Sequence, residues 1–337
     1  MKVLYIILLL PALLFADMNA YNMTHTVKAR PIALGGAFMA VPGGISSAMY
    51  NPATLSLERY RSDTQFSLYL NPLGAISMIH DYSAVDQERP LTTLDHIHMA
   101  GTLIKGLAFS RPFFSSQLVL SEPLYSDDAM PESKDPDAIS SKHILDSNFD
   151  VLMFNLKLAD QISIGASMLM FTTMQNSEIE HTHGTAYGIY LRPYTTFSVG
   201  ICFYDIPNHL ADLFFKNTRI PDETINVGIR VTPIPSLSAN LDIRNVSEEE
   251  NDIIREVHSG LEWTLGKIAS LRTGYYYEKE IKTHVYSAGL GLFSNNLFHS
   301  TDNAFDTGDF IVNYGIQIRS AKPENDLYHY LTVKIRI

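Results

Sequence analysis

From about residue 63 onward, apolar and polar residues alternate with a period of two over many short segments of the chain. The segment 237–244 reads LSANLDIR, in which every odd-numbered residue is apolar and every even-numbered residue is polar. Because successive side chains of a β-strand point to opposite faces, this alternation predicts a strand with one apolar face. Similar patterns occur in the segments 161–170, 225–231, 257–265 and 310–319.

Soluble β-sandwiches also contain alternating strands, so other features must distinguish the two classes of protein. The alternating segments are about 8–12 residues long, which is the length that a tilted membrane-spanning strand needs. Their polar faces carry small and charged residues, as the wall of a wet or plugged lumen does. Aromatic residues lie at segment ends, as at 275–277, Tyr328 and Tyr330. We therefore predict an all-β fold, a transmembrane antiparallel barrel of about fourteen strands.

The segment 328–337 reads YHYLTVKIRI and is predicted to close the barrel. Its apolar face consists of Leu331, Val333, Ile335 and Ile337. A last strand of this kind pairs with the first strand, which removes the exposed sheet edges. As the edge of a soluble sheet, the same four residues would favour aggregation.

The composition supports the membrane assignment and excludes several partners. Only 18% of the residues are charged, whereas about 25% is usual in soluble domains. The net charge of −11 disfavours a nucleic-acid partner. The single cysteine, Cys202, excludes an intramolecular disulfide and a cysteine-rich zinc site.

The first twenty residues, MKVLYIILLLPALLFADMNA, are predicted to be a secretory signal peptide. Lys2 supplies the positive charge, an apolar run follows, and Ala16 or Ala20 is suitable for cleavage. The predicted domains are therefore the signal peptide at 1–20, an N-terminal hatch at 21–60 and the barrel at 61–337. The predicted location is the cell outer membrane, with membrane lipid and the outer-membrane assembly machinery as partners.

The segment 28–57, KARPIALGGAFMAVPGGISSAMYNPATLSL, does not alternate. Its glycine pairs at 35–36 and 43–44 bracket small residues and predict a tightly turned, closely packed stretch. Ser46 or Ser47 is predicted to cap a short helix that ends before the following proline. Paired glycines also occur in phosphate-binding loops, but neither the lysine nor the strand–helix unit of such a loop is present.

This segment carries a family resemblance through Ala29, Arg30, the run LGGAF at 34–38, Ala40, Val41, Ala48 and the sequence NPATL at 51–55. Together these residues resemble the opening motif of FadL-like outer-membrane proteins, and the closer match is to the PorV/PorQ branch. Later segments that agree with this resemblance are 219–230, 236–243, 259–277 and 286–292.

The resemblance implies that this N-terminal stretch folds as a hatch in the lumen of a barrel of about fourteen strands. The hatch motif then consists of Gly35, Gly36, Ala37, Phe38, Asn51, Pro52 and Ala53. The resemblance also implies passage of hydrophobic, fatty-acid-like molecules, or alternatively service to type IX protein secretion through binding of exported substrate proteins. A structural surface barrel without transport is the third hypothesis.

For the transport hypothesis, Phe38, Met39 and Met49 are predicted to line an apolar ligand groove. His96 with His98, and His181 with His183, would each share one face of a strand, but neither pair has an identifiable third metal ligand. No catalytic motif is found, so neither an enzyme, a metal site nor a cofactor is predicted.

Overall fold

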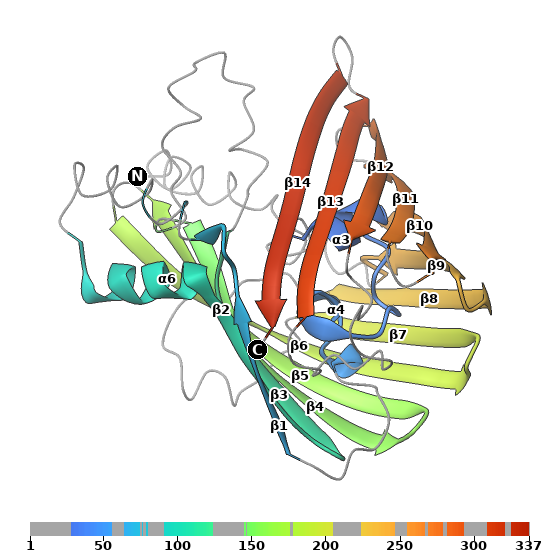
Figure 1. Cartoon of the computed structure of the whole chain (residues 1–337), viewed down its shortest axis with the longest axis horizontal. Coiled ribbons are helices and arrows are strands. Elements are labelled where there is room, and N and C mark those ends of the chain that lie inside the picture. Colours follow the sequence, from blue (N-terminus) through green and yellow to red (C-terminus); the bar gives the residue numbers. More distant parts are fainter. Residues whose placement is uncertain are drawn as a thin grey trace, which may run out of the picture.

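The alternating segments form fourteen strands, which close into a single antiparallel barrel in a computed structural model of the chain (Figure 1). The predicted fold class is therefore confirmed. The structure describes residues 28–55, 64–74, 76, 79, 91–123, 145, 147–175, 178–204, 224–246, 255–266, 269–278, 282–292, 309–320 and 325–336. The predicted signal peptide, both ends of the predicted hatch and Ile337 lie outside these residues.

Every strand is hydrogen-bonded to its sequence neighbours, and β1 is also bonded to β14. The strands are β1 (Gln65–Leu70), β2 (Ile104–Arg111), β3 (Phe114–Pro123), β4 (Ser147–Ala159), β5 (Ile162–Gln175), β6 (Glu178–Tyr194), β7 (Phe197–Tyr204), β8 (Thr224–Ile234), β9 (Leu237–Arg244), β10 (Glu256–Leu265), β11 (Ala269–Glu278), β12 (Thr283–Leu292), β13 (Asp309–Ser320) and β14 (Asn325–Arg336).

The two faces of the wall differ as the alternation predicts. On β9, Asp242 and Arg244 are 0% and 5% exposed, whereas Leu241 is 39% exposed. On β10, His258 and Glu262 are buried while the apolar residues between and beside them are exposed. An exposed apolar face on the outside and buried polar side chains within are the arrangement of a membrane-spanning barrel.

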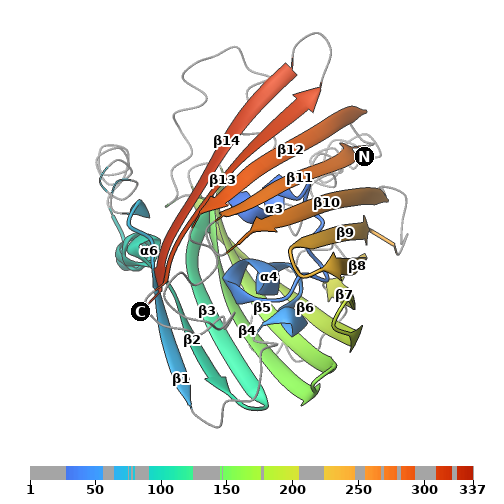
Figure 2. The same cartoon turned by 45° about the vertical axis from the view of Figure 1, so that its right-hand side comes forward.

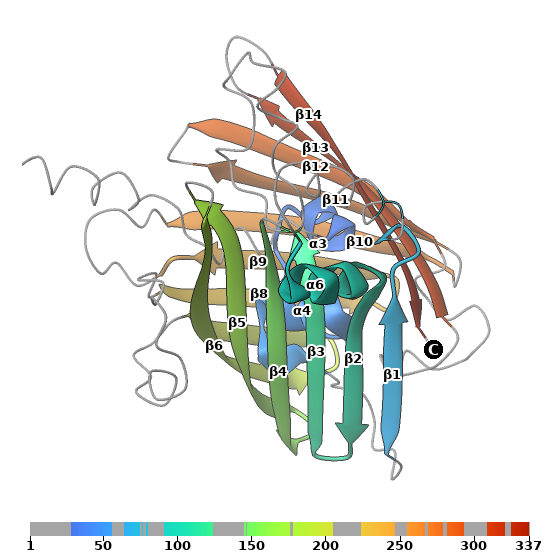
Figure 3. The same ribbon diagram turned by 90° about the vertical axis from the view of Figure 1, so that its left-hand side faces the viewer.

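The predicted closing strand does pair with the first strand, but over a short length. β14 forms twelve residue pairs with β13, and only two with β1, which are Tyr69 with Arg336 and Leu70 with Ile335. The seam, by which we mean the junction of β14 with β1, is thus the shortest pairing in the wall. In Figure 3, β1 and β14 meet only near the C-terminal end of β14.

A helix at 93–103 lies between β1 and β2, outside the strand pattern. This helix, α6 (Thr93–Leu103), begins with a capping box in which Thr92 and Asp95 exchange hydrogen bonds. The prediction that His96 and His98 share one face of a strand is therefore wrong, because residues two apart on a helix point in different directions. Among the described residues, no helix is long and apolar enough to cross a membrane.

Residues 28–55, here called the inner segment, lie within the ring of strands (Figure 2). They comprise the helices α3 (Ala29–Ala33) and α4 (Gly44–Tyr50) and the 3-10 helix η1 (Pro52–Thr54). The predicted capping of α4 by a serine is wrong: the helix begins at Gly44, and its N-cap is Gly43, whose φ of 106° suits glycine.

Candidate functional site

The contact between the inner segment and the barrel wall is the candidate functional site. All seven residues of the predicted hatch motif lie in this segment and are buried. Side chains from β3, β9, β10 and β14 reach its backbone or its charged groups. The structure thus brings the motif residues together against the inner side of the wall.

Glycines in the wall allow the inner segment to approach the strands closely. A β-carbon added at Gly200 would lie 2.0 Å from the Met39 carbonyl oxygen, and one at Gly274 would lie 2.0 Å from the Gly35 nitrogen. Real β-carbons do not approach backbone atoms to within such distances, so these positions require glycine. Other wall glycines against the inner segment are Gly165, Gly188, Gly228, Gly260, Gly289 and Gly315.

A buried carboxylate holds the turn that follows the glycine pair. Asp242 on β9 accepts hydrogen bonds from the backbone nitrogens of Phe38, at 2.5 Å, and Met39, at 2.9 Å. Such charge-assisted bonds are about twice as strong as neutral ones. Asp242 is fully buried, so these two bonds fix the turn to the wall.

Two further polar side chains bind the glycine pair itself. The Arg244 guanidinium donates to the Gly36 carbonyl oxygen over 2.9 Å. Nδ1 of His258 lies 2.6 Å from the carbonyl oxygen of Gly35. Both glycines have positive φ, of 62° and 76°, a conformation that glycine adopts without strain. The glycine pair thus forms a turn whose carbonyl oxygens are bound by polar side chains of β9 and β10.

Asn51 organises the other end of the inner segment. Its side-chain nitrogen donates to the carbonyl oxygens of Met39 and Ile189, each over 3.2 Å, and its oxygen accepts from the Ala53 nitrogen. Asn155 and Ser163 in turn donate to the Ala53 carbonyl oxygen. The Asn-Pro-Ala part of the motif is thus a hydrogen-bonded turn attached to β4, β5 and β6.

An ion cluster fixes the beginning of the inner segment to β10 and β11. Arg30 contacts Glu262 through two bonds, of 2.9 and 3.1 Å. Arg272 donates to the same carboxylate over 2.7 Å and to Asn313 over 2.8 Å. Two-pronged arginine–carboxylate contacts define orientation as well as position. Helix α3 is therefore held in one orientation.

The lumen wall has an apolar side, which the alternation does not predict. Its inward apolar side chains on β3 to β7 include Val119, Phe149, Val151, Met153, Leu169, Phe171, Ala186, Cys202 and Tyr204, and here they are called the apolar wall. They form one continuous buried cluster with apolar residues of the inner segment. The inward residues of β8 to β14 are mostly polar or charged.

The predicted groove residues Phe38, Met39 and Met49 are all buried in this apolar cluster. The centres of the Phe38 and Tyr50 rings lie 5.3 Å apart. The guanidinium carbon of Arg30 lies over the Phe38 ring, 5.3 Å from its centre. The Tyr204 hydroxyl donates to the Tyr50 carbonyl oxygen. Burial raises the pKa of the Tyr50 phenol, so this ring stays neutral.

The structure contains no group of three or more metal-ligating side chains among its described residues. His181 and His183 do lie on a strand, β6, two positions apart.

Sequence reasoning missed the roles of Asp242, Arg244 and Glu262. Their positions on the polar faces of predicted strands indicated the lumen but not their partners.

These features define the protein as a closed antiparallel barrel of the outer-membrane type whose lumen holds a tightly bound N-terminal segment. No protein-family model matches the sequence, and no curated protein matches it.

Among solved structures, the chain is similar to the toluene transporter TbuX of Ralstonia pickettii, with 12% identity, a TM-score of 0.49 and coverage of 94% of this chain and 98% of that chain. It is also similar to the CymD monoaromatic hydrocarbon channel, with 9% identity, a TM-score of 0.50 and the same two coverages. At such identity the likeness to CymD concerns the fold.

Proposed function

We propose that this protein passes hydrophobic small molecules, of a fatty-acid-like kind, across the outer membrane. In this proposal, residues 21–60 act as the hatch, and the chain is a FadL-like member of the PorV/PorQ branch that is exported by a signal peptide at 1–20. The apolar molecule binds between the inner segment and the apolar wall.

The observation that carries this proposal is the apolar wall. A lumen that conducts water and ions is polar on its inner face, whereas here Phe149, Met153 and Phe171 face inward and are at most 1% exposed. They belong to the same buried apolar cluster as Phe38 and Met49, and such surroundings favour apolar molecules over hydrated ones. The fold shared with a hydrocarbon channel supports the same class of cargo.

Replacement of Phe38 or Met49 by glutamine is expected to weaken binding of an apolar ligand by about tenfold or more, because a buried amide without partners disfavours apolar occupancy. The measurement is titration of purified protein with a fluorescent fatty acid. Phe113→Gln is the matched control, since Phe113 is 55% exposed and lies in the turn between β2 and β3.

Assembly of each variant is checked by its resistance to denaturation in detergent before and after heating. Binding that survives both Phe38→Gln and Met49→Gln in assembled protein would place the ligand elsewhere and contradict the proposed groove. Loss of binding in Phe113→Gln as well would show that the effect is not specific to the inner segment.

Gentle extraction of the protein from its native membrane distinguishes the transport proposal from the secretion hypothesis. Mass spectrometry of the copurifying material is expected to find an apolar small molecule in stoichiometric amount. A large exported protein in its place would identify the barrel as an accessory of protein secretion and overturn the transport proposal.

A further inference from the structure

An arginine and an asparagine lie side by side on the inner face of the wall. Arg230 on β8 and Asn240 on β9 are directly opposite each other in the sheet, so their β-carbons lie about 5 Å apart. Both side chains point inward, because Gly228 and Asp242, two positions along the same strands, contact the inner segment. Asn240 is 5% exposed, and Arg230 is partly exposed.

The polar atoms of this pair are not satisfied by the chain. Nδ2 and Oδ1 of Asn240 and Nε of Arg230 are buried, and none of the three atoms has a hydrogen-bond partner in the part of the chain that the structure describes. Buried polar atoms of side chains are nearly always hydrogen-bonded, and an unpaired one is destabilising. Two neighbouring nitrogen donors without an acceptor therefore favour a ligand that accepts hydrogen bonds.

Three arginines share one carboxylate at this place. Arg30 and Arg272 bind Glu262 directly, over 2.9 and 2.7 Å. The charges of Arg30 and Glu262 also act on Arg230. Among the described residues, Glu262 is the only carboxylate whose charge acts on any of the three arginines. Three guanidinium groups against one carboxylate leave two positive charges in excess, and such an excess within a protein favours binding of an anion.

The pair adjoins the turn of the inner segment at 35–41. Ser198 on β7 is opposite Arg230 and donates to the Ala40 carbonyl oxygen over 3.0 Å. Met39, which precedes Ala40, belongs to the buried cluster that contains the apolar wall. The unpaired donors thus lie beside the contact between the inner segment and the apolar wall, which is where the proposed function places the ligand.

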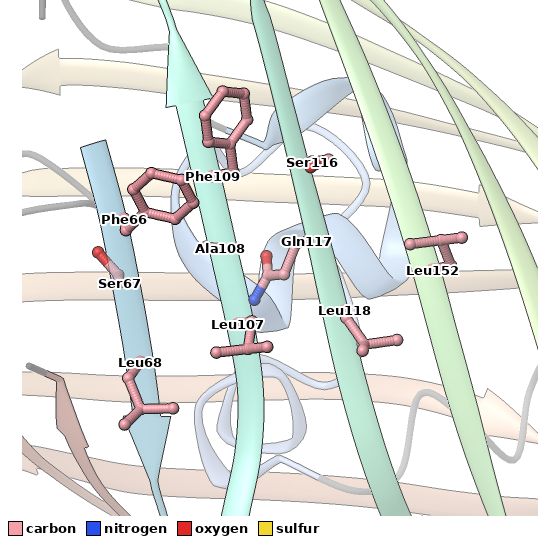
Figure 4. A pocket seen from close by; sticks show the side chains of 10 residues that line it. All are labelled: Phe66, Ser67, Leu68, Leu107, Ala108, Phe109, Ser116, Gln117, Leu118 and Leu152. Atoms are coloured by element: carbon pink, nitrogen blue, oxygen red, sulfur yellow. The ribbon is translucent and has the colours of Figure 1, made fainter. Parts of the chain in front are cut away.

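The cavity of about 320 Å³ on β1 to β4 lies on the outer side of the wall and does not belong to this site. Figure 4 shows Phe66, Leu107 and Phe109 in front of the strands, with the inner segment behind them. Phe66 and Leu107 are 72% and 51% exposed, as expected of apolar side chains that face membrane lipid. None of the three arginines lines this cavity.

We propose that Arg230 and Asn240 form an oxyanion-binding site in the lumen, with Arg30 and Arg272 as the surrounding positive charge. The Arg230 guanidinium and the Asn240 amide nitrogen donate to the oxyanion, and a guanidinium matches the geometry of a carboxylate or a phosphate. Where the oxyanion is the headgroup of the cargo, the inference rests on the proposed function and gives that cargo a negative charge. A free inorganic anion is the other source of the same chemistry.

The test is calorimetric titration of the purified full-length protein in a neutral detergent with octanoate, with octanol and with inorganic phosphate. Octanoate and octanol have equal chain lengths and differ in charge. Arg230→Gln removes the charge, and Asn240→Leu removes the amide at similar size. Neither change removes a hydrogen bond between described residues, so both barrels are expected to assemble. Arg319→Gln is the matched control, because Arg319 is also a buried arginine, 8% exposed, but lies on β13.

Arg230→Gln is expected to weaken octanoate binding about tenfold or more, since hydrogen bonds to charged groups contribute on that scale. Asn240→Leu is expected to weaken it about fivefold. Octanol binding is expected to stay unchanged in both variants, and Arg319→Gln is expected to affect neither ligand. Unchanged octanoate binding in Arg230→Gln and Asn240→Leu would overturn the oxyanion site, while octanol binding would leave the proposed function standing. An equal loss in Arg319→Gln would show a general effect of lumen charge and also overturn the site.

Inorganic phosphate separates the two sources of the oxyanion. Phosphate that binds much more weakly than octanoate identifies the headgroup of the cargo as the occupant. Phosphate bound as tightly as octanoate, and weakened by Arg230→Gln, retains the site but identifies a free anion as its occupant. If neither octanoate nor octanol binds, yet phosphate binds through Arg230, the proposed function is contradicted and the site stands. Binding of none of the three contradicts both.

Discussion

Gly274→Val is expected to open the barrel to polar solutes. A β-carbon at this position meets the Gly35 nitrogen at 2.0 Å and the Leu34 carbonyl carbon at 2.2 Å. Both are backbone atoms, so the inner segment must move away from β11. A barrel of fourteen strands without its inner segment holds a water-filled lumen, and we expect conductance in planar bilayers to rise about tenfold or more.

The matched control for this prediction is Leu271→Val. Leu271 lies on the same strand, β11, but on the outer face of the wall, where it is 43% exposed. We expect Leu271→Val to retain a closed barrel. Low conductance in an assembled Gly274→Val barrel would contradict this prediction. It would mean that the inner segment stays in the lumen despite the substitution, or that the inner segment is not what closes the lumen.

Asp242→Ala is expected to release the turn at 35–41 from the wall. The change leaves the buried backbone nitrogens of Phe38 and Met39 without acceptors. Each unsatisfied buried group costs about 1–3 kcal/mol, so the local contact should lose roughly 3 kcal/mol. Amide hydrogen exchange of residues 35–41 is then expected to accelerate by about two orders of magnitude.

Asp242→Asn retains one acceptor oxygen, and we expect it to accelerate exchange less than Asp242→Ala does. Asp160→Ala removes a carboxylate that is 66% exposed and should leave exchange at 35–41 unchanged. Equal exchange in the wild type and in Asp242→Ala would mean that Asp242 does not hold the turn.

The barrel wall could be predicted from the sequence because the period-two pattern is local. Alternation on β9 assigns Asp242 to the polar face without knowledge of any other strand. The pairing of β14 with β1 follows from the same pattern at the last segment. Mid-strand glycines such as Gly200 and Gly274 also indicate close backbone approach, a signal that was available in the sequence.

The partners of the lumen residues could not be predicted, because they depend on the register of the closed barrel. Asp242 and Phe38 are 204 positions apart in the chain, and no local pattern connects them. The apolar wall was missed because its inward residues, such as Met153, are apolar. On these strands both faces are apolar in the sequence, so the alternation does not show which residues face the lumen. Helix α6 could have been found from Thr92 and Asp95, whose spacing is that of a capping box.

We propose that the barrel admits apolar molecules while its inner segment excludes polar ones. The most direct measurement is uptake of radiolabelled laurate and of a polar sugar of similar mass by liposomes that contain the purified protein. We expect laurate to enter and bind well above the level of protein-free liposomes, whereas the sugar is expected to stay at that level. Entry of the sugar at a rate comparable to that of laurate, or no effect of the protein on either, would contradict the claim.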